Sequence, residues 1–262
     1  EADMLVAQLT DTHVTARGRL ASGRVDTAAH LRRAVARLNA LAPDAVIHSG
    51  DLADRGAPEE YDAAADILAD LRAPLFAVPG NHDRRAPLRR FGFADAPGDF
   101  CAGEAWVGPL RLIGLDSSVP GAPHGELGAA QRDWLAARLA ERPEAPTLAF
   151  VHHPPFATGI AHMDAMNLAD GDALLDLLAR HPQVLHLACG HVHRAVSTVA
   201  RGVAASVGPS PAHAIALDLD PAAAAGFRLE PPMLRLFRFA GGALASHLAF
   251  VDEAPGPFPF AD

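Results

Sequence analysis

The sequence predicts an α/β fold with a mostly parallel sheet at its core and antiparallel strands added after it. Short apolar runs typical of strands alternate with stretches of helical periodicity over most of the chain. Alternation of strand and helix is typical of a parallel sheet. Near Gly241 and Gly242 the pattern changes to that of a hairpin. We therefore expect one domain over residues 1–262, with 210–262 forming a C-terminal hairpin and a Pro-rich tail.

The first part of the chain contains three predicted strands, at residues 4–9, 44–51 and 73–80. Between the first two, Leu31, Val35 and Leu38 recur at helical spacing, and Asp26 is placed to cap the helix. Pro58 opens a second helix before the third strand. These elements predict two consecutive strand–helix–strand units.

The middle of the chain repeats this pattern with strands at 109–118, 147–155 and 184–193. The apolar residues of the two intervening helices are Leu127, Trp134, Leu135, Leu139, Leu174, Leu175, Leu177 and Leu178. Residues 234–251 are expected to form two strands of a hairpin, and the segment "APGPFPFAD" the tail.

Composition excludes several classes of protein. Half of the residues are hydrophobic, but no uninterrupted apolar run approaches the roughly 20 residues that span a bilayer. The formal net charge of −9 argues against a nucleic-acid-binding protein, because such affinity comes mainly from Lys and Arg. Cys101 and Cys189 are too few for a disulfide framework, and no signal-type segment precedes the first strand. We expect a cytoplasmic protein without membrane or nucleic-acid partners.

Five predicted strands end in polar side chains that bind metals. The motifs are "DTH", "GD", "GNHD", "VHH" and "GHVH", and they supply Asp11, His13, Asp51, Asn81, His82, His152, His153, His191 and His193. Ligands of open α/β sheets lie beyond the carboxyl ends of the strands, where these motifs meet if the strands are parallel neighbours. Asp11 and His13 are two residues apart, so in an extended chain both side chains would point to the same side. The pattern predicts a pocket.

The donor set indicates the kind of metal. Two Asp, one Asn and four His offer oxygen and nitrogen without thiolate, which suits Mn, Fe, Co or Zn rather than Ca or a structural zinc. Seven ligands are too many for one tetrahedral ion, and suit two divalent ions about 3.5 to 4 Å apart if one carboxylate bridges them. The seven candidates are Asp11, His13, Asp51, Asn81, His152, His191 and His193.

The other histidines carry weaker signals. His213, like most of them, lies outside these motifs and is expected to be a packing or surface group. His153 stays open between a core or surface position and a role in orienting a metal ligand by a hydrogen bond.

The five blocks resemble the calcineurin-like metallophosphoesterases, whose pattern of Asp-x-His, Gly-Asp, Gly-Asn-His-Asp/Glu, His and Gly-His-x-His is present here, complete and in order. The resemblance implies a four-layer αββα sandwich with two mixed β-sheets. It implies that one metal is held by Asp11, His13 and His193. The second metal would be held by Asn81, His152 and His191, with Asp51 bridging the two and His82 facing the substrate phosphate.

Three further segments, "LIGLDSSVPG", "HHPP" and "GIAHMDAMNL", are similar to the branch of bacterial cyclic-nucleotide phosphodiesterases and glycerophosphodiesterases. The resemblance implies hydrolysis of a small phosphodiester, a glycerophosphodiester or a 3',5'-cyclic nucleotide, by attack of a metal-bound hydroxide. The catalytic residues would be His82, Asn81 and Asp51. The alternatives are a phosphomonoesterase on the same scaffold and a non-catalytic interaction module with a residual metal site.

Relatives of this kind are often dimers or larger. The apolar segment "LRLFRF" of the hairpin is accordingly a candidate interface for a homo-oligomer. The ligands themselves do not distinguish Fe, Mn, Zn and Co, nor one small phosphodiester from another.

Overall fold

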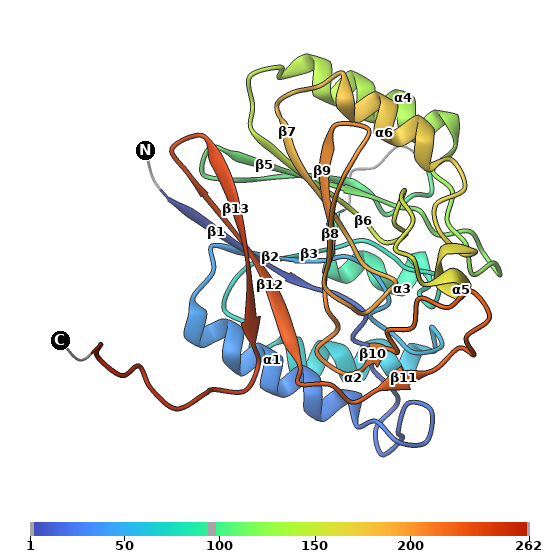
Figure 1. Cartoon of the computed structure of the whole chain (residues 1–262), viewed down its shortest axis with the longest axis vertical. Helices are drawn as coiled ribbons and strands as arrows, with labels where there is room; N and C mark the ends of the chain where they lie inside the picture. Colours follow the sequence, from blue (N-terminus) through green and yellow to red (C-terminus); the bar gives the residue numbers. More distant parts are fainter. Residues whose placement is uncertain (1–2, 94–97, 261–262) are drawn as a thin grey trace.

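The computed structural model describes residues 3–93 and 98–260 and contains two large sheets between two pairs of helices. In Figure 1, α1 (Thr27–Leu41) and α2 (Pro58–Leu68) lie on one side of the sheets, and α4 (Gly128–Glu141) and α6 (Gly171–Ala179) lie on the opposite side. The predicted α/β class with two mixed sheets is confirmed.

The first sheet has five strands in the order β13-β12-β1-β2-β3. Its members are β1 (Met4–Leu9), β2 (Ala45–His48), β3 (Leu75–Ala77), β12 (Met233–Ala240) and β13 (Ala243–Phe250). The first three strands are parallel, β12 is antiparallel to β1, and β13 is antiparallel to β12. The predicted C-terminal hairpin is thus present, and it extends this sheet on one side.

The second sheet has six strands in the order β4-β5-β6-β7-β9-β8. Its members are β4 (Gly103–Val107), β5 (Leu110–Leu115), β6 (Thr147–Val151), β7 (Val184–Cys189), β8 (Val196–Ala200) and β9 (Val203–Val207). The four inner strands are parallel, and both edge strands are antiparallel to their neighbours. A separate ribbon joins β10 (Ala214–Ile215) to β11 (Phe227–Arg228).

Local sequence explains the helix boundaries. The Asp26 carboxylate accepts a hydrogen bond from the backbone N–H of Ala29 at 2.9 Å, which caps α1 as predicted. Pro58 stands at the start of α2, where its missing N–H costs nothing. Three short elements complete the described part of the chain: α3 (Arg85–Leu88), the 3-10 helix η1 (Arg89–Phe91) and α5 (Ala161–Asp164).

Three apolar clusters hold the layers together. Leu31 of α1 belongs to a cluster between the first pair of helices and the first sheet, and Leu174 of α6 to a cluster on the outer face of the second sheet. Between the sheets, Phe150 of β6 packs in one cluster with Phe237 of β12. Full burial of such a side chain stabilises the fold by roughly 1.5–3 kcal/mol. The clusters therefore define the four layers, helix, sheet, sheet and helix.

The structure corrects the expectation of one parallel core. The motif-bearing strands are divided between the sheets, with β1, β2 and β3 in the first and β6 and β7 in the second. Because the sheets pack face to face, the carboxyl ends of the two sets still lie at the same end of the molecule. The site is therefore built at the junction of two sheets rather than along the edge of one.

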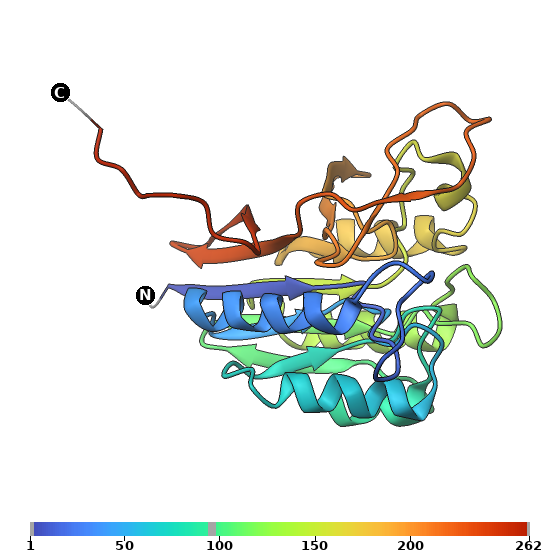
Figure 2. The same ribbon diagram turned by 90° about the horizontal axis from the view of Figure 1, so that it is seen from below.

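The described residues beyond β13 extend away from the body of the molecule (Figure 2). The predicted tail ends in Ala261 and Asp262, which lie outside the described residues. Within 3–93 and 98–260, none of the helices combines the length and apolar character needed to cross a membrane.

Candidate metal centre

All seven predicted ligands converge at the carboxyl ends of β1, β2, β3, β6 and β7. Ligand atoms of Asp11, His13 and His193 lie within 4.8 Å of one another, and the same holds for Asp11, Asp51 and His152. The two groups share Asp11, so they form one continuous cluster. Asn81 joins it through a contact with His152. His191 joins it because its ligand atom lies within 4.8 Å of those of His152 and His153.

The backbone turns sharply at the predicted ligands. Five of them have positive φ angles: Asp11 at 52°, His13 at 44°, Asp51 at 56°, His191 at 73° and His193 at 55°. This left-handed region is costly for residues other than glycine and is found preferentially at functional sites. The paired ligands were expected to point to one side because the chain is extended there. That reason was wrong, since left-handed backbone turns direct these side chains toward the cluster.

Glycine in the motifs allows very close approach. A Cβ on Gly50 would lie 2.3 Å from Nδ1 of His152, and a Cβ on Gly80 would lie 2.2 Å from Oδ1 of Asp51. Both distances are shorter than any real Cβ contact. Gly50 and Gly80 are therefore required by the ligand of a neighbouring segment.

The first group is centred on His193. Its Nε2 lies 3.2 Å from Oδ1 of Asp11 and 3.2 Å from Nε2 of His13. Its Nδ1 lies 3.2 Å from the backbone carbonyl oxygen of His213, a contact that holds the ring with Nε2 toward the cluster. Nδ1 of His13 lies 3.6 Å from Oδ1 of Asp54, which orients that ring in the same way.

The second group is centred on His152. Its Nε2 lies 3.2 Å from Oδ1 of Asn81 and 3.3 Å from Oδ2 of Asp51, while Nδ1 contacts the carbonyl oxygen of Ser49 at 2.8 Å. The same Oδ2 of Asp51 lies 3.6 Å from Nε2 of His13 in the first group. One carboxylate oxygen thus reaches both groups.

His191 supplies a test of whether the residues fit a metal. Its Nε2 is buried and has no hydrogen-bond partner among the described residues. Leaving a buried polar atom unpaired costs about 1–3 kcal/mol, so such atoms are rare without a purpose. The free nitrogen of His191 and the surrounding carboxylate, amide and imidazole donors together suit a site for two divalent cations.

Electrostatics favour ionised carboxylates in the cluster. Burial raises the pKa of Asp11, but the charge and hydrogen bond of His193 outweigh it and hold that pKa well below its usual range. Asp51 behaves likewise, with His152 as the lowering group. Burial lowers the pKa of His152, yet Asp51 and Asp11 raise it to about 9. A metal that binds the His152 ring would therefore displace a proton from it.

His82 stands at the mouth of the cluster with an exposed side chain. Its backbone N–H donates to Oδ1 of Asp51 at 2.8 Å, and its Nδ1 contacts the carbonyl oxygen of Asp54. Burial lowers its pKa, but the negative charge of Asp51 and the contact with Asp54 together raise it above the usual value. His82 and Asn81 line a cavity of about 830 Å³, together with Arg84, Arg85 and 118–121 among others.

Asp83 holds the loop that carries these residues. Its carboxylate accepts backbone N–H groups from Leu52 at 3.1 Å, Ala53 at 3.0 Å and Gly80 at 3.1 Å. These bonds tie the loop after β3 to the loop after β2. The sequence reveals Asp83 as the last residue of "GNHD" but gives no sign of this role.

Besides His82, two further histidines among the described residues contact the cluster without being predicted ligands. The ring of His213 lies 4.6 Å from that of His193 and 5.6 Å from that of His13, so the packing role expected from the sequence places it against two predicted ligands. No motif surrounds His213, and no sequence signal could have placed it. His153 has both ring nitrogens engaged, by Ser117 Oγ at 2.8 Å and the Pro123 carbonyl at 3.2 Å, and packs against His152.

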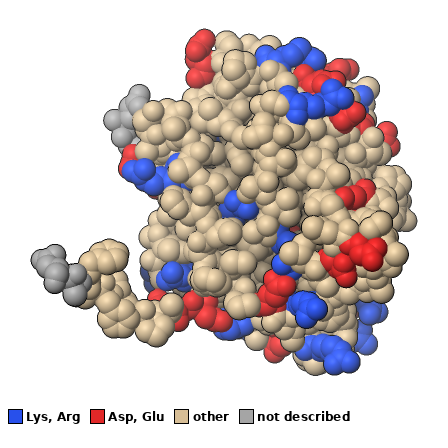
Figure 3. Space-filling model, in the orientation of Figure 1, with Lys and Arg blue, Asp and Glu red and all other residues tan. Residues whose placement is uncertain are grey.

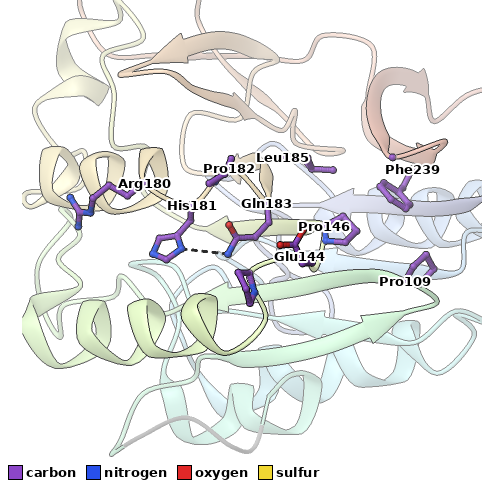
Figure 4. A pocket seen from close by; sticks show the side chains of 11 residues that line it. Pro109, Glu144, Pro146, Arg180, His181, Pro182, Gln183, Leu185 and Phe239 are labelled. Atoms are coloured by element: carbon purple, nitrogen blue, oxygen red, sulfur yellow. Dashed lines mark hydrogen bonds between the residues drawn. The ribbon is translucent and has the colours of Figure 1, made fainter.

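A second cavity, of about 690 Å³, lies at the opposite end of the sheets, before the first residues of β6 and β7 (Figure 4). Its lining includes Pro109, Pro146, Pro182, Phe239 and Gly242. None of the predicted ligands lies among its lining residues.

Comparison with known proteins identifies the family. Residues 4–195 match the family model described as calcineurin-like phosphoesterase. The chain belongs to the calcineurin-like phosphoesterase family. This phosphoesterase is 38% identical over 264 residues to a probable glycerophosphodiester phosphodiesterase GpdQ of Arcobacter nitrofigilis, covering 98% of the chain and 97% of that protein. It is 36% identical over 203 residues to the 3',5'-cyclic adenosine monophosphate phosphodiesterase CpdA of Escherichia coli, covering 74% and 71%.

The fold of this phosphoesterase also matches a solved structure. A dimetal phosphatase from Danio rerio superposes with a TM-score of 0.67 at 17% identity, over 95% of the chain and 99% of that structure. At this identity the likeness establishes the fold alone. It supports the four-layer arrangement independently of the sequence matches.

Proposed function

We propose that this phosphoesterase is a dinuclear metal-dependent phosphodiesterase that hydrolyses a small phosphodiester, a glycerophosphodiester or a 3',5'-cyclic nucleotide. The observation that carries the proposal is the position of Asp51. Its Oδ2 lies 3.6 Å from His13 Nε2 and 3.3 Å from His152 Nε2, between the two groups of ligands. A carboxylate in this position suits a bridge between two cations.

The residues divide into two sets. Asp11, His13 and His193 would hold one divalent ion, and Asn81, His152 and His191 the other, with Asp51 shared. The ions, of Fe, Mn, Zn or Co, would supply Lewis-acid activation of the phosphate and lower the pKa of water from 15.7 to about 7. The two carboxylates leave such a centre with net positive charge, which favours an anionic phosphodiester.

Two side chains of the loop after β3 would act on the substrate directly. His82 faces the 830 Å³ cavity, and in its protonated form it would neutralise the departing alkoxide. Asn81 shares its amide oxygen with the metal group and would use its N–H₂ to donate to a phosphate oxygen. Asp83 keeps both in place by fixing the loop.

The substrate class is supported by the relatives, since those reported above are named as glycerophosphodiester and cyclic nucleotide phosphodiesterases. The cavity beside His82 is within the range of 300–1,000 Å³ usual for small-molecule sites. It leaves room for both alcohol groups of a small diester. A cytoplasmic location and the lack of a nucleic-acid partner stay predictions.

Metal removal tests the proposal. The chelated protein should lose hydrolysis of bis(p-nitrophenyl) phosphate and regain it with Mn²⁺, Zn²⁺, Co²⁺ or Fe²⁺, and elemental analysis should find two ions per chain. Asp51→Asn and His191→Ala should each reduce turnover more than about 100-fold, since they remove direct ligands. His247→Ala, an exposed histidine on β13, is the matched control and should leave turnover unchanged.

Substrate panels separate the rival functions. A faster rate on p-nitrophenyl phosphate than on the diester would make the protein a monoesterase. Metal-dependent stability without hydrolysis of any mono-, di- or cyclic ester would make it a non-catalytic module. Full turnover in Asp51→Asn would refute the shared carboxylate.

A further inference from the structure

Strand β13 differs from the other edge strands of the two large sheets. It has eight residues, "ALASHLAF", with no charged residue and no proline. The opposite edge of the same sheet, β3, has three residues, and β4 in the second sheet carries Glu104. Edge strands are usually short or protected by charge or proline, because their free backbone groups pair readily with other chains. By this criterion β13 is unprotected.

The surface of β13 is also apolar. Leu248 is 48% exposed and Phe250 is 54% exposed. Figure 3 shows that the face over β12, β13 and β8 is largely free of Lys, Arg, Asp and Glu. The other uncharged edge strand, β8, has five residues, and Arg201 directly after it is paired with Asp172 and Asp176. A long uncharged edge with exposed large side chains is typical of an interface.

The hydrogen-bonding pattern of β13 shows which of its backbone groups are free at the outer edge of the sheet. The N–H of Val251 donates to the carbonyl of Pro232, so odd-numbered residues of the strand bond toward β12. Leu244, Ser246, Leu248 and Phe250 therefore direct their N–H and C=O groups to the outer edge. Among the described residues no strand pairs with that edge. Of these groups, only the carbonyl of Phe250 contacts a side chain there, Nε of Arg37 at 3.2 Å.

We propose that β13 pairs antiparallel with β13 of a second copy of this chain, so that the two five-stranded sheets become one continuous sheet across a two-fold axis. Such an isologous contact sets each strand against itself. A charged strand would then place like charges opposite one another, which is destabilising. Because β13 carries no charged residue, this repulsion does not arise. A second copy also brings a strand with the same exposed apolar side chains, which an unrelated partner need not have.

The segment that follows β13 also favours a second copy of this chain as the partner. Asp252 and Glu253 are paired with Arg33 and Arg37 of α1, which fixes the start of the segment. Beyond them Phe258 is 76% exposed and Phe260 is fully exposed. In the antiparallel pair this segment runs past the β12–β13 turn of the other copy. The proline-lined cavity of Figure 4 opens beside that turn, at Phe239 and Gly242, and would receive the aromatic residues.

This interface differs from the one expected from the sequence. The segment "LRLFRF" belongs to β12, which lies between β1 and β13, and Leu234 and Phe237 are fully buried. It is therefore unavailable to a second copy. The strand after it in the hairpin takes that role.

The register follows from the free groups. Pairing the largest number of them places Leu244 opposite Phe250 and Ser246 opposite Leu248, with His247 on the two-fold axis. His247 would then face its own counterpart in a non-hydrogen-bonded pair, with the two Cα atoms about 4.5 Å apart. Residues at this separation can form a disulfide.

Crosslinking tests the register. His247→Cys should form an intermolecular disulfide under mild oxidation, visible as a dimer on non-reducing gels. Ala243→Cys is the control, because that exposed residue would lie roughly 26 Å from its counterpart and should not crosslink. The native Cys101 and Cys189 are buried and should not contribute. Failure of His247→Cys to crosslink, or equal crosslinking of both variants, would overturn the proposal.

Sedimentation velocity on the full chain tests the interface itself. The unmodified protein should sediment as a dimer, and Leu248→Lys should weaken the dimer at least tenfold. Val199→Lys, on the 71%-exposed position of the other uncharged edge strand, should leave it unchanged. Ser246 is kept, because its Oγ accepts a hydrogen bond from buried Arg235 at 2.7 Å. A monomer, or dissociation by Val199→Lys alone, would contradict the inference.

The C-terminal segment has its own variant. The double substitution Phe258→Ser with Phe260→Ser should weaken the dimer measurably, but less than Leu248→Lys, since the strand pairing is retained. No weakening would remove the segment from the proposed interface. None of these readouts depends on hydrolysis, so they stand apart from the test of the proposed function.

Discussion

Gly80 and Asp51 are in such close contact that the backbone of one fixes the carboxylate of the other. A Cβ atom on Gly80 would lie 2.2 Å from Oδ1 of Asp51 and 2.6 Å from its backbone nitrogen. The same Oδ1 accepts the N–H of His82 at 2.8 Å. The loop after β3 and the loop after β2 are thereby locked together at the shared carboxylate.

Gly80→Ala should therefore displace Asp51 and disable the site. We expect turnover of a chromogenic diester to fall about 100-fold, because displacements near 1 Å cost this much in positioned sites. Gly226→Ala is the matched control, since its Cβ would meet nothing within 4 Å among the described residues and its φ is ordinary. Equal activity of the two variants would show that the contact does not position the carboxylate.

His213→Ala should lower activity without removing metal. The ring of His213 packs 4.6 Å from that of His193, and the carbonyl oxygen of the same residue contacts Nδ1 of His193, a contact that the substitution leaves intact. Loss of a side chain that orients a ligand typically costs 10–100-fold, and we expect about tenfold in kcat. Elemental analysis should still find both ions. An unaltered kcat would return His213 to the packing role expected from the sequence.

Metal binding should raise the stability of the fold in addition to supporting the reaction. The predicted ligands come from both sheets, with Asp51 after β2 and His152 after β6. A ligand at 100 times its Kd adds about 2.7 kcal/mol, or roughly 5–10 °C in Tm for a chain of this size. Calorimetry with and without chelator measures this shift. An unchanged Tm on metal addition would mean that the cluster does not bind cations tightly.

The stability of the protein should fall in mild acid partly through His186. Burial, assisted by Arg235, lowers the pKa of this histidine from 6.5 to about 4, and its Nε2 contacts Ser206 Oγ at 2.8 Å. The unfolded chain therefore binds a proton between pH 6.5 and 4 that the folded chain does not, so stability is present above this window and is lost as pH falls through it. His186→Gln should flatten this part of the Tm profile. Parallel profiles for the two proteins would contradict the assignment.

Much of the fold follows from sequence periodicity, and the failures have physical causes. The strands that precede the motifs were predicted because they are largely apolar runs, and β2 and β6 are buried along their whole length. Strands β8 and β9, "VSTVA" and "VAASV", are rich in small residues and give a weak signal. The turn between them, Arg201 and Gly202, has φ of 49° and 83°, but Arg-Gly is not one of the residue pairs that mark such a hairpin turn in a sequence.

The candidate site was predicted more completely than its surroundings. Ligand types and spacing are written in short motifs, so all seven side chains could be selected from the sequence. Asp54, Asp83 and His213 could not, because their contacts depend on loops from different strands meeting in space. The division of the ligands between two sheets was likewise invisible to an analysis of local pattern.

The left-handed backbone at Asp11, His13, Asp51, His191 and His193 limits how the site can be re-engineered. Asp, Asn and His tolerate that conformation several times better than most residues, whereas β-branched side chains resist it. Exchanges among carboxylate, amide and imidazole are therefore open at these positions, and replacement by Val, Ile or Thr would be opposed by the main chain before any chemistry is considered. Attempts to alter metal selectivity should draw on that small palette.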